Sequence, residues 1–129
     1  MGGRLDAAPS DLNEATRRVD RQHGERVAAR LERFAALPAG DFVWTRDAEA
    51  ELWLGRIEGE WRFDASAAAW EVDLQHVRVC RWSDAPVPLP DVPAAVLATF
   101  ARGGRNFQRV RDADAEAATC RWWAEHDSP

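Results

Sequence analysis

Residues 40–64 read GDFVWTRDAEAELWLGRIEGEWRFD, and large apolar side chains recur in them between polar ones. Phe42 and Trp44 share one face of an extended segment, as expected for a strand that is half buried in a sheet. Two further strands are predicted at residues 51–57 and 61–63, joined by a tight Glu-Gly turn. The stretch therefore predicts a β region that is rich in hairpins.

The alternation changes phase further along the chain. It holds over residues 70–74 and resumes in the opposite phase over residues 77–79. Such a change predicts a bulge or bend near residues 75–76, which is the usual way in which a sheet curls toward a barrel. With a short strand at residues 106–110, the barrel core is predicted to span residues 41–110.

Helices are predicted on both sides of this β region. Apolar residues recur at three- and four-residue steps over residues 11–36, which predicts one amphipathic helix. A C-terminal helix is predicted over residues 112–126, and a short helix begins at Pro93. Residues 1–10 are expected to form a flexible tail and residues 11–129 a single domain with one core. The predicted fold class is α+β.

Composition narrows the range of functions. The formal net charge of -5 at pH 7 argues against a protein that binds nucleic acid through bulk positive charge. The basic residues are all arginine, so Schiff-base and P-loop chemistry lose their usual lysine. Cys80 and Cys120 form no paired motif, and a cytoplasmic location is expected. No apolar run reaches membrane-spanning length, so no membrane partner is predicted.

The sequence offers few groups for catalysis. His23, His76 and His126 lie far apart, and none has a second histidine or a cysteine at chelating spacing. Acidic pairs in the β region are most simply explained as a solvated face. We therefore predict a non-enzyme with no catalytic residue, no metal and no cofactor. An enzyme assembled from residues distant in sequence is the least favoured alternative.

Tryptophan is the most unusual feature of the composition. The chain has seven Trp, five Phe and no Tyr, and five of the tryptophans fall in the β region. Any one of them is most simply a core residue, but a small barrel has room for only a few indoles. One or two are therefore expected to line a pocket for an unstacked base or a methylated ammonium, since indole faces stack on flat or cationic groups.

Two sets of residues are candidates for such a site. The predicted ligand-binding residues are Trp44, Thr45, Trp53, Trp61, Trp82 and Gln108. The predicted contacts to a nucleic-acid backbone are Arg46, Arg78, Arg105 and Arg109. For the arginines the alternative is a solvated surface.

Several segments resemble the motifs of a family of small prokaryotic domains. They are residues 40–46, 52–57, 61–64, 76–82, 92–100 and 107–110. Their order is similar to that of PUA-like domains, related to EVE and ASCH modules, which occur alone or beside restriction-type nucleases in defence systems. The resemblance implies a small curved PUA-like β-barrel flanked by an N-terminal and a C-terminal helix, with a pocket for a modified or flipped base.

Together these patterns predict a non-catalytic module that recognises a modified or flipped base of DNA or RNA in an aromatic pocket. The expected context is defence, restriction or nucleic-acid processing, with a nuclease or other defence protein as a candidate partner. The alternative is an adaptor that docks a partner protein on the same tryptophan-rich surface. A concave indole-lined pocket would favour the base reader, and a flat apolar patch would favour the adaptor.

Overall fold

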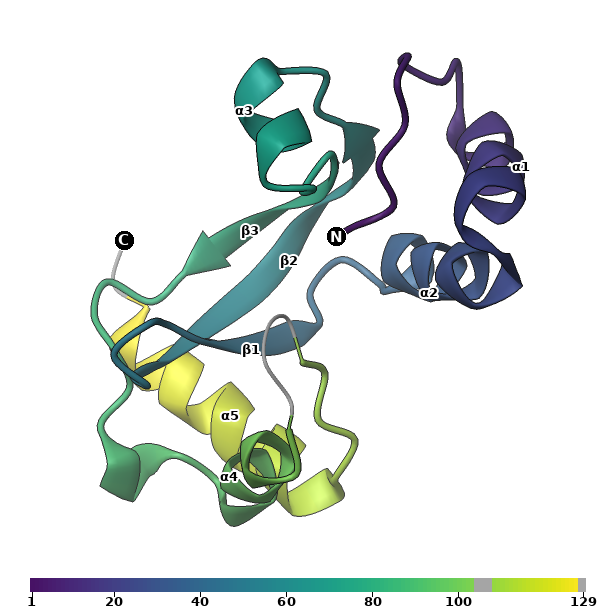
Figure 1. Cartoon of the computed structure of the whole chain (residues 1–129). Coiled ribbons are helices and arrows are strands. Elements are labelled where there is room, and N and C mark those ends of the chain that lie inside the picture. The colour runs from purple at the N-terminus through teal and green to yellow at the C-terminus, as the bar shows by residue number, and fades with distance from the viewer. Residues whose placement is uncertain (104–107, 128–129) are drawn as a thin grey trace. The chain divides into compact units, whose positions relative to one another are not determined.

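The structure is a computed structural model of the 129-residue chain, and it describes residues 1–103 and 108–127. The chain divides into two compact units (Figure 1). Unit 1 comprises Met1–Ala39 and Glu58–Val79, and unit 2 comprises Gly40–Ile57 and Cys80–Pro129. Helices and strands are mixed along the chain, which confirms the predicted α+β class.

The sheet of the described residues has three strands in the order β1-β2-β3. Strand β1 spans Phe42–Arg46, β2 spans Leu52–Phe63 and β3 spans His76–Trp82. The first two are antiparallel, with Val43 opposite Gly55. This sheet is open, so closure into a barrel is not found in the part of the chain that the structure describes.

Strand β2 runs without interruption through Glu58 and Gly59, so the predicted turn at this point is wrong. Gly59 serves a close approach of two strands instead. A Cβ at residue 59 would lie 2.9 Å from Cβ of Val79, and Arg78 Nε donates to the Gly59 carbonyl at 2.6 Å. The glycine allows β3 to pack tightly against β2.

Residues 70–74 also differ from the prediction, because they do not form a strand. Helix α3 spans Ala67–Glu71, and the Ser66 hydroxyl caps it by accepting from the Ala69 N–H at 3.2 Å. The apolar side chains that alternate here are exposed; they are Trp70, Val72 and Leu74. Strand β3 begins only at His76. The change of phase therefore marks the passage from helix to strand and not a bulge within a strand.

The predicted N-terminal helix is two helices. Helix α1 spans Leu12–His23 and α2 spans Glu25–Ala36, and they lie side by side (Figure 1). Gly24 between them has φ 94° and ψ 166°, which an L-residue with a side chain rarely adopts. The single-helix prediction is wrong because this glycine turns the chain. The two helices bury their apolar faces in the core of unit 1, whose members are Leu5, Ala15, Val19, Ala28 and Leu31.

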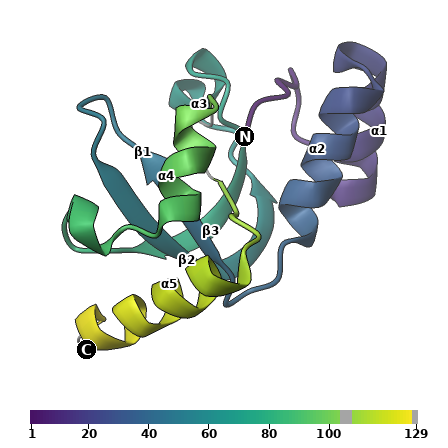
Figure 2. The same cartoon turned by 90° about the horizontal axis from the view of Figure 1, so that it is seen from below.

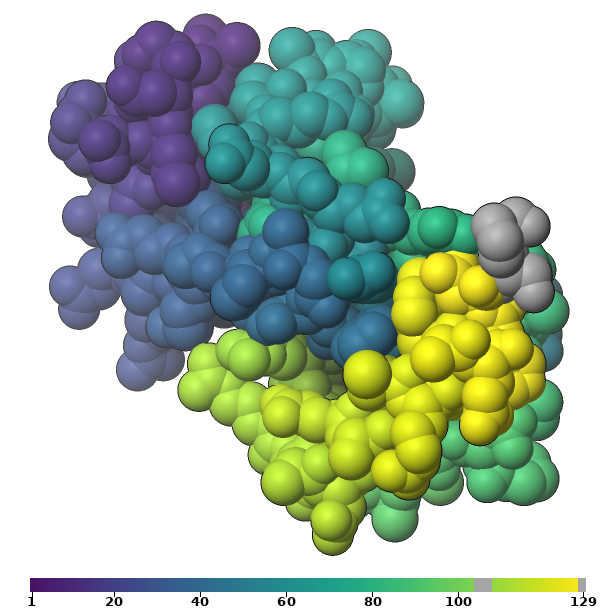
Figure 3. All heavy atoms as spheres, turned by 180° about the vertical axis from the view of Figure 1, so that it is seen from behind, coloured from purple at the N-terminus to yellow at the C-terminus, as the bar shows by residue number. Residues whose placement is uncertain are grey.

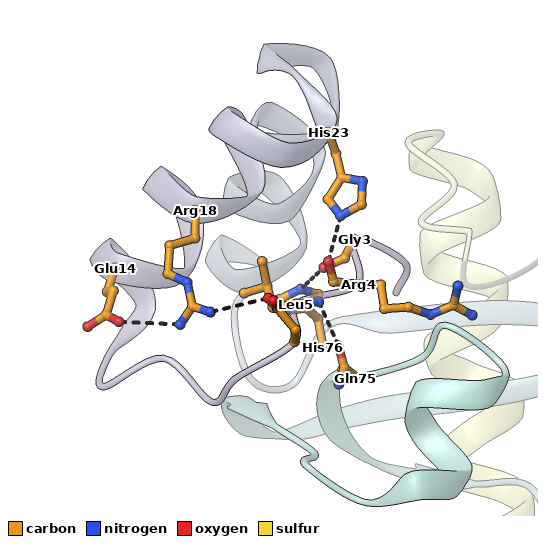
Figure 4. A network of polar contacts seen from close by, with 9 residues as sticks. Gly3, Arg4, Leu5, Glu14, Arg18, His23, Gln75 and His76 are labelled. Carbon is orange, nitrogen blue, oxygen red and sulfur yellow. Dashed lines mark hydrogen bonds and ion pairs between the residues drawn. The ribbon is translucent and has the colours of Figure 1, made fainter.

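The first residues make specific contacts within unit 1, which differs from the flexible tail expected (Figure 4). The Leu5 side chain is 1% exposed, and its backbone N–H donates to Gln75 Oε1 at 2.9 Å. The Gly3 N–H donates to Asp73 Oδ1 at 3.2 Å. Burial of Leu5 and the satisfaction of these backbone donors hold the segment in place.

A fully buried histidine connects this segment with β2. His76 Nε2 lies 2.9 Å from the Gly3 carbonyl oxygen, and Trp61 Nε1 donates to His76 Nδ1 at 3.2 Å. With Nδ1 as an acceptor, the proton of the neutral ring lies on Nε2 and is donated to Gly3. Burial lowers the pKa of His76, because a charged imidazolium would lose its hydration there.

Unit 2 contains α4, Ala94–Ala101, and α5, Ala113–His126. Figure 2 shows that the axes of these two helices are inclined to each other. They agree with the short helix predicted after Pro93 and with the C-terminal helix predicted over 112–126. The core of this unit comprises Trp44, Leu52, Leu54, Val87, Val92, Val96, Phe100 and Trp123. Most of the buried apolar residues that the structure describes thus belong to two clusters, one in each unit, where one core was expected.

The strand predicted at residues 106–110 lies partly outside the described residues. Gln108 forms an isolated antiparallel bridge with Trp44, in which the two backbones exchange hydrogen bonds of 2.9 and 2.7 Å. Among the described helices, none has the length and apolar character needed to cross a membrane.

Candidate functional site

Unit 2 has a pocket of about 290 Å³ between the end of β3, the loop that follows it and the last turns of α5. We call it the indole pocket. Its lining residues are Arg81, Trp82, Ser83, Asp84, Ala85, Pro86, Pro88, Trp122, Trp123, His126 and Asp127. Figure 3 shows α5, in yellow, with much of its surface open to solvent.

Trp82 is the last residue of β3, and its side chain is 39% exposed. Its six-membered ring lies against Gly55 of β2, where a Cβ would come within 2.7 Å of ring carbons Cε3 and Cζ3. The next residue, Ser83, is tied to the same strand by its N–H, which donates to the Leu54 carbonyl at 2.8 Å. The absence of a side chain at Gly55 therefore makes room for the indole.

Helix α5 contributes two consecutive tryptophans that face about 100° apart on the helix. Trp123 points into the core of unit 2, is 7% exposed, and contacts the ring of Phe42 at a centroid distance of 5.6 Å. Trp122 is half-buried, and its indole N–H donates to Asp91 Oδ2 at 3.2 Å. In the lining of the pocket, the Trp123 indole is thus buried and the Trp122 indole is partly exposed.

His126 lies four residues after Trp122 and stacks on it. The ring centroids are 4.1 Å apart and the planes are inclined by 12°. His126 Nδ1 also lies 2.8 Å from the Trp122 carbonyl oxygen. Because residues four apart share one helix face, this nearly parallel pair is a consequence of the sequence spacing. The imidazole therefore covers one face of the Trp122 indole.

One polar group of the lining has no partner. The Trp123 Nε1–H is buried and donates to no acceptor within the described residues. An unpaired buried donor is unfavourable, and native proteins contain few of them. The Trp123 indole N–H is thus a hydrogen-bond donor on the α5 side of the pocket that has no acceptor among the described residues.

The charged lining residues are one arginine and two aspartates. Arg81 Nη2 and Asp127 Oδ1 form an ion pair at 2.6 Å. The exposed carboxylate of Asp84 has no ion-pair or hydrogen-bond partner in the part of the chain that is described. After the ion pair is taken into account, the pocket retains one negative charge.

The lining shows no arrangement for nucleophilic catalysis. The Ser83 hydroxyl accepts from the Leu54 N–H at 3.3 Å, and His126 is engaged with Trp122. The two side chains are therefore not paired with each other as nucleophile and base. What the arrangement offers is three indoles, an imidazole and a carboxylate around a concave space.

A second cavity of about 260 Å³ in unit 2 contains two of the predicted site residues, Trp44 and Arg109. Arg109 Nε pairs with Asp41 Oδ2 at 3.1 Å, so its charge is already balanced. Trp44 is 3% exposed and belongs to the core of unit 2. The structure thus brings these two residues to one cavity but leaves little of the indole accessible.

The remaining predicted residues of unit 2 lie in β1, in β2 or at the isolated bridge beside β1. Thr45 lies opposite Trp53 in the sheet. The Trp53 indole N–H donates to Asp47 Oδ2 at 2.9 Å. The Arg46 guanidinium lies 5.6 Å from the Phe100 ring centroid. Gln108 forms the bridge to Trp44 described above. Of the six predicted ligand-binding residues, only Trp82 lines the indole pocket.

Two predicted site residues belong to unit 1 and support its structure. The Trp61 indole N–H donates a hydrogen bond to His76 Nδ1. Arg78 donates from Nη1 to the carbonyls of Phe34 and Ala35 at 2.9 and 3.2 Å, where helix α2 ends. Arg105 lies outside the described residues. Of the predicted arginines that the structure describes in unit 2, Arg46 and Arg109, neither lines the indole pocket.

The turn between β1 and β2 brings three carboxylates together. Asp47, Glu49 and Glu51 each place one oxygen within 4.8 Å of the others. The Trp53 indole N–H lowers the pKa of Asp47, with further help from the backbone N–H groups of Glu51 and Glu49. These hydrogen bonds to Asp47 stabilise the turn and so account for the proximity of the three carboxylates. Exposed acidic groups of this kind are common on protein surfaces.

Sequence reasoning missed Trp122, Trp123, His126 and Asp84 as site residues. The sequence predicts the two tryptophans in the C-terminal helix, and all six predicted ligand-binding residues lie in the β region. A signal was present, because Trp122 and His126 have the i, i+4 spacing of a stacked pair. Their proximity to Trp82, forty residues earlier, depends on the tertiary structure. In comparisons of the chain with known proteins, no family model, no curated protein and no solved structure matches it.

Proposed function

We propose that this chain is a binding module that holds a planar heteroaromatic ring, specifically a nucleobase, in the indole pocket. The observation that carries the proposal is the lining of this cavity by Trp82, Trp122 and Trp123 together with the His126 imidazole. A volume of about 290 Å³ is at the lower limit of ligand pockets. It suits a single ring system better than a peptide.

The stacking of His126 on Trp122 supports this choice of guest. An imidazole and a nucleobase are both flat nitrogen heterocycles, and both stack on indole faces. The cavity is concave, which favours a ring-binding module over the adaptor, for which a flat apolar patch is the expected feature. The polar neighbours Asp84 and Ser83 can contact the edge of a bound ring.

Nucleic acid as the source of the ring is supported by the motifs that resemble those of PUA-like domains. On this proposal the base is modified or flipped out, so that both of its faces are free to stack. A role in defence or restriction beside a nuclease follows from the same resemblance. Since Arg81 and Arg109 are already paired with aspartates, contacts to phosphates contribute little, and binding should depend only weakly on salt.

The test is a titration with nucleosides and short single-stranded oligonucleotides that carry modified or unmodified bases, followed by tryptophan fluorescence. Trp82→Ala and Trp122→Ala should each weaken binding by about 1–3 kcal/mol, which is roughly 5- to 150-fold. Trp70→Ala is the matched control, because Trp70 is exposed to a similar extent, 42%, and belongs to unit 1.

Two results would overturn the proposal. One is the absence of any fluorescence change with every base at low salt. The other is unchanged binding by Trp82→Ala and Trp122→Ala proteins whose circular dichroism matches that of the parent chain.

A further inference from the structure

We infer that the indole pocket prefers a positively charged planar ring, such as a base alkylated on a ring nitrogen, over the neutral parent base. This inference rests on the proposed function, because it concerns the same site. It concerns the charge of the ring, which the presence of indoles alone does not determine.

The first argument is the charge of the lining. The Arg81 guanidinium and the Asp127 carboxylate neutralise each other at 2.6 Å. The Asp84 carboxylate, on the loop after β3, has no partner among residues 1–103 and 108–127. A cationic guest would place its charge beside this carboxylate, whereas a neutral base gains no Coulombic energy there.

The second argument is the electronic character of the indoles. The face of an indole carries partial negative charge and attracts cations. The Trp122 indole N–H donates to the Asp91 carboxylate at 3.2 Å. Such a hydrogen bond increases the partial negative charge on the indole ring. Trp82 adds a second indole that is 39% exposed. Both features favour a ring with a delocalised positive charge over a neutral ring of equal area.

The third argument is that the described residues of the lining include no unpaired arginine to contact a phosphate. A site built to hold a base through its attached phosphate needs an arginine that is free to contact the phosphate oxygens. The one arginine of this lining is held by Asp127. The pocket therefore directs its electrostatic attraction at the ring itself.

The experiment measures fluorescence quenching of the full chain by pairs of nucleosides that differ in charge. The pairs are 1-methyladenosine against adenosine and 7-methylguanosine against guanosine. N6-methyladenosine adds the same methyl group without a charge and controls for the area of the methyl. The cationic member of each pair should bind about tenfold more tightly than the neutral one, and N6-methyladenosine should behave like adenosine.

Asp84→Asn removes the free carboxylate with little change in volume. It should reduce the preference for the cationic ring, measured as the ratio of the two dissociation constants of the same variant, to about threefold or less. Asp114→Asn is the matched control, because Asp114 is an exposed aspartate in the first turn of α5 and does not line the pocket. Tetramethylammonium, a cation without a ring, should bind much more weakly than 1-methyladenosine.

Failure of this inference and failure of the proposed function give different results. Equal affinity for charged and neutral rings, lost in Trp82→Ala, would overturn the preference and leave the ring-binding function standing. Tight binding of tetramethylammonium would identify the site as a general ammonium cage and overturn the preference for a planar ring. If no nucleoside binds, both proposals are wrong.

Discussion

At the residue scale, the position of Trp82 depends on Gly55, which belongs to the neighbouring strand. The indole occupies the space that a Cβ at residue 55 would need. One missing methyl group therefore sets the position of a tryptophan that lines the indole pocket, although Gly55 itself does not line it. The effect is steric and can be tested without a ligand.

Gly55→Ala should displace the Trp82 indole and destabilise the protein by about 1–3 kcal/mol, the usual cost of overpacking. The free energy of unfolding in urea gives the cost, and the nucleoside titration gives the loss of binding. In the Trp82→Ala background the clash is absent, so the same substitution should cost much less. Equal costs in the two backgrounds would show that Gly55 and Trp82 are not in contact.

His76 leads to a prediction about pH. Its pKa is lowered chiefly by burial, and the Met1 amine and His23 add to this effect; the Gly3 carbonyl and Asp73 oppose it. The unfolded chain, with a histidine pKa of about 6.5, then binds a proton more readily than the folded chain. Stability should be full above about pH 6.5 and should fall as the pH drops toward the lower folded pKa.

The measurement is the urea midpoint between about pH 5 and pH 8. His76→Gln keeps a donor for the Gly3 carbonyl and should flatten the dependence on pH. His126→Gln is the comparison variant, because it changes an exposed histidine of unit 2. If the two variants gave the opposite pattern, His76 would not be the responsible group.

At the element scale, the pair α1 and α2 shows how a single backbone conformation sets the arrangement of helices. The amphipathic pattern runs through residues 11–36 almost without a break, so periodicity alone predicts one helix. Gly24, at φ 94°, interrupts it, and the two halves can then fold back on each other and share a core. Neither apolar face would be covered in this way if the helix were continuous.

Gly24→Ala should destabilise the protein by about 1–3 kcal/mol, because an alanine is strained in this conformation. A Cβ at residue 24 would meet no atom within 4 Å, so the cost comes from the backbone alone. Urea unfolding measures it, with far-UV circular dichroism as the measure of helix content. A gain in both stability and helix content would mean that the chain forms one continuous helix in solution.

Sequence patterns predict individual elements of this protein better than they predict the links between them. The C-terminal helix and β1 were found where their patterns are regular. The errors fall at Gly24, at Gly59 and in residues 70–74. At Gly24 the backbone conformation ends a helix that the periodicity continues, and at Gly59 the close approach of Val79 explains a glycine within a strand. Gly24 breaks a helix that the periodicity predicts as continuous, whereas Gly59, predicted in a turn, lies within a strand.

At the scale of the whole molecule, the same limit applies to the site. Trp82 was predicted because it lies in a tryptophan-rich region, but its partners Trp122 and Trp123 come from a helix forty residues away. Alternation along strands cannot show which helix packs beside the end of β3. The sequence therefore predicts the kind of chemistry that we propose, aromatic stacking, whereas the set of residues that line the pocket depends on the fold.

The presence of two cores predicts that stability and binding respond differently to changes in each unit. Leu31→Ala should cost about 2–5 kcal/mol, because it opens a cavity in the core of unit 1. Val96→Ala removes fewer methyl groups from the cluster of unit 2, which includes Trp123 of the pocket lining. Loosening the packing around Trp123 should weaken nucleoside binding, whereas Leu31→Ala should leave the dissociation constant within about twofold of the parent value.

Urea unfolding and the nucleoside titration, performed on the same protein samples, separate the two effects. The expected result is the greater loss of stability in Leu31→Ala and the greater loss of affinity in Val96→Ala. A bound ligand stabilises only the folded chain, so saturating nucleoside should raise the urea midpoint of Leu31→Ala as much as that of the parent. Equal loss of affinity in two folded variants would show that the clusters act as one core, and the pocket would then depend on the packing of the whole chain.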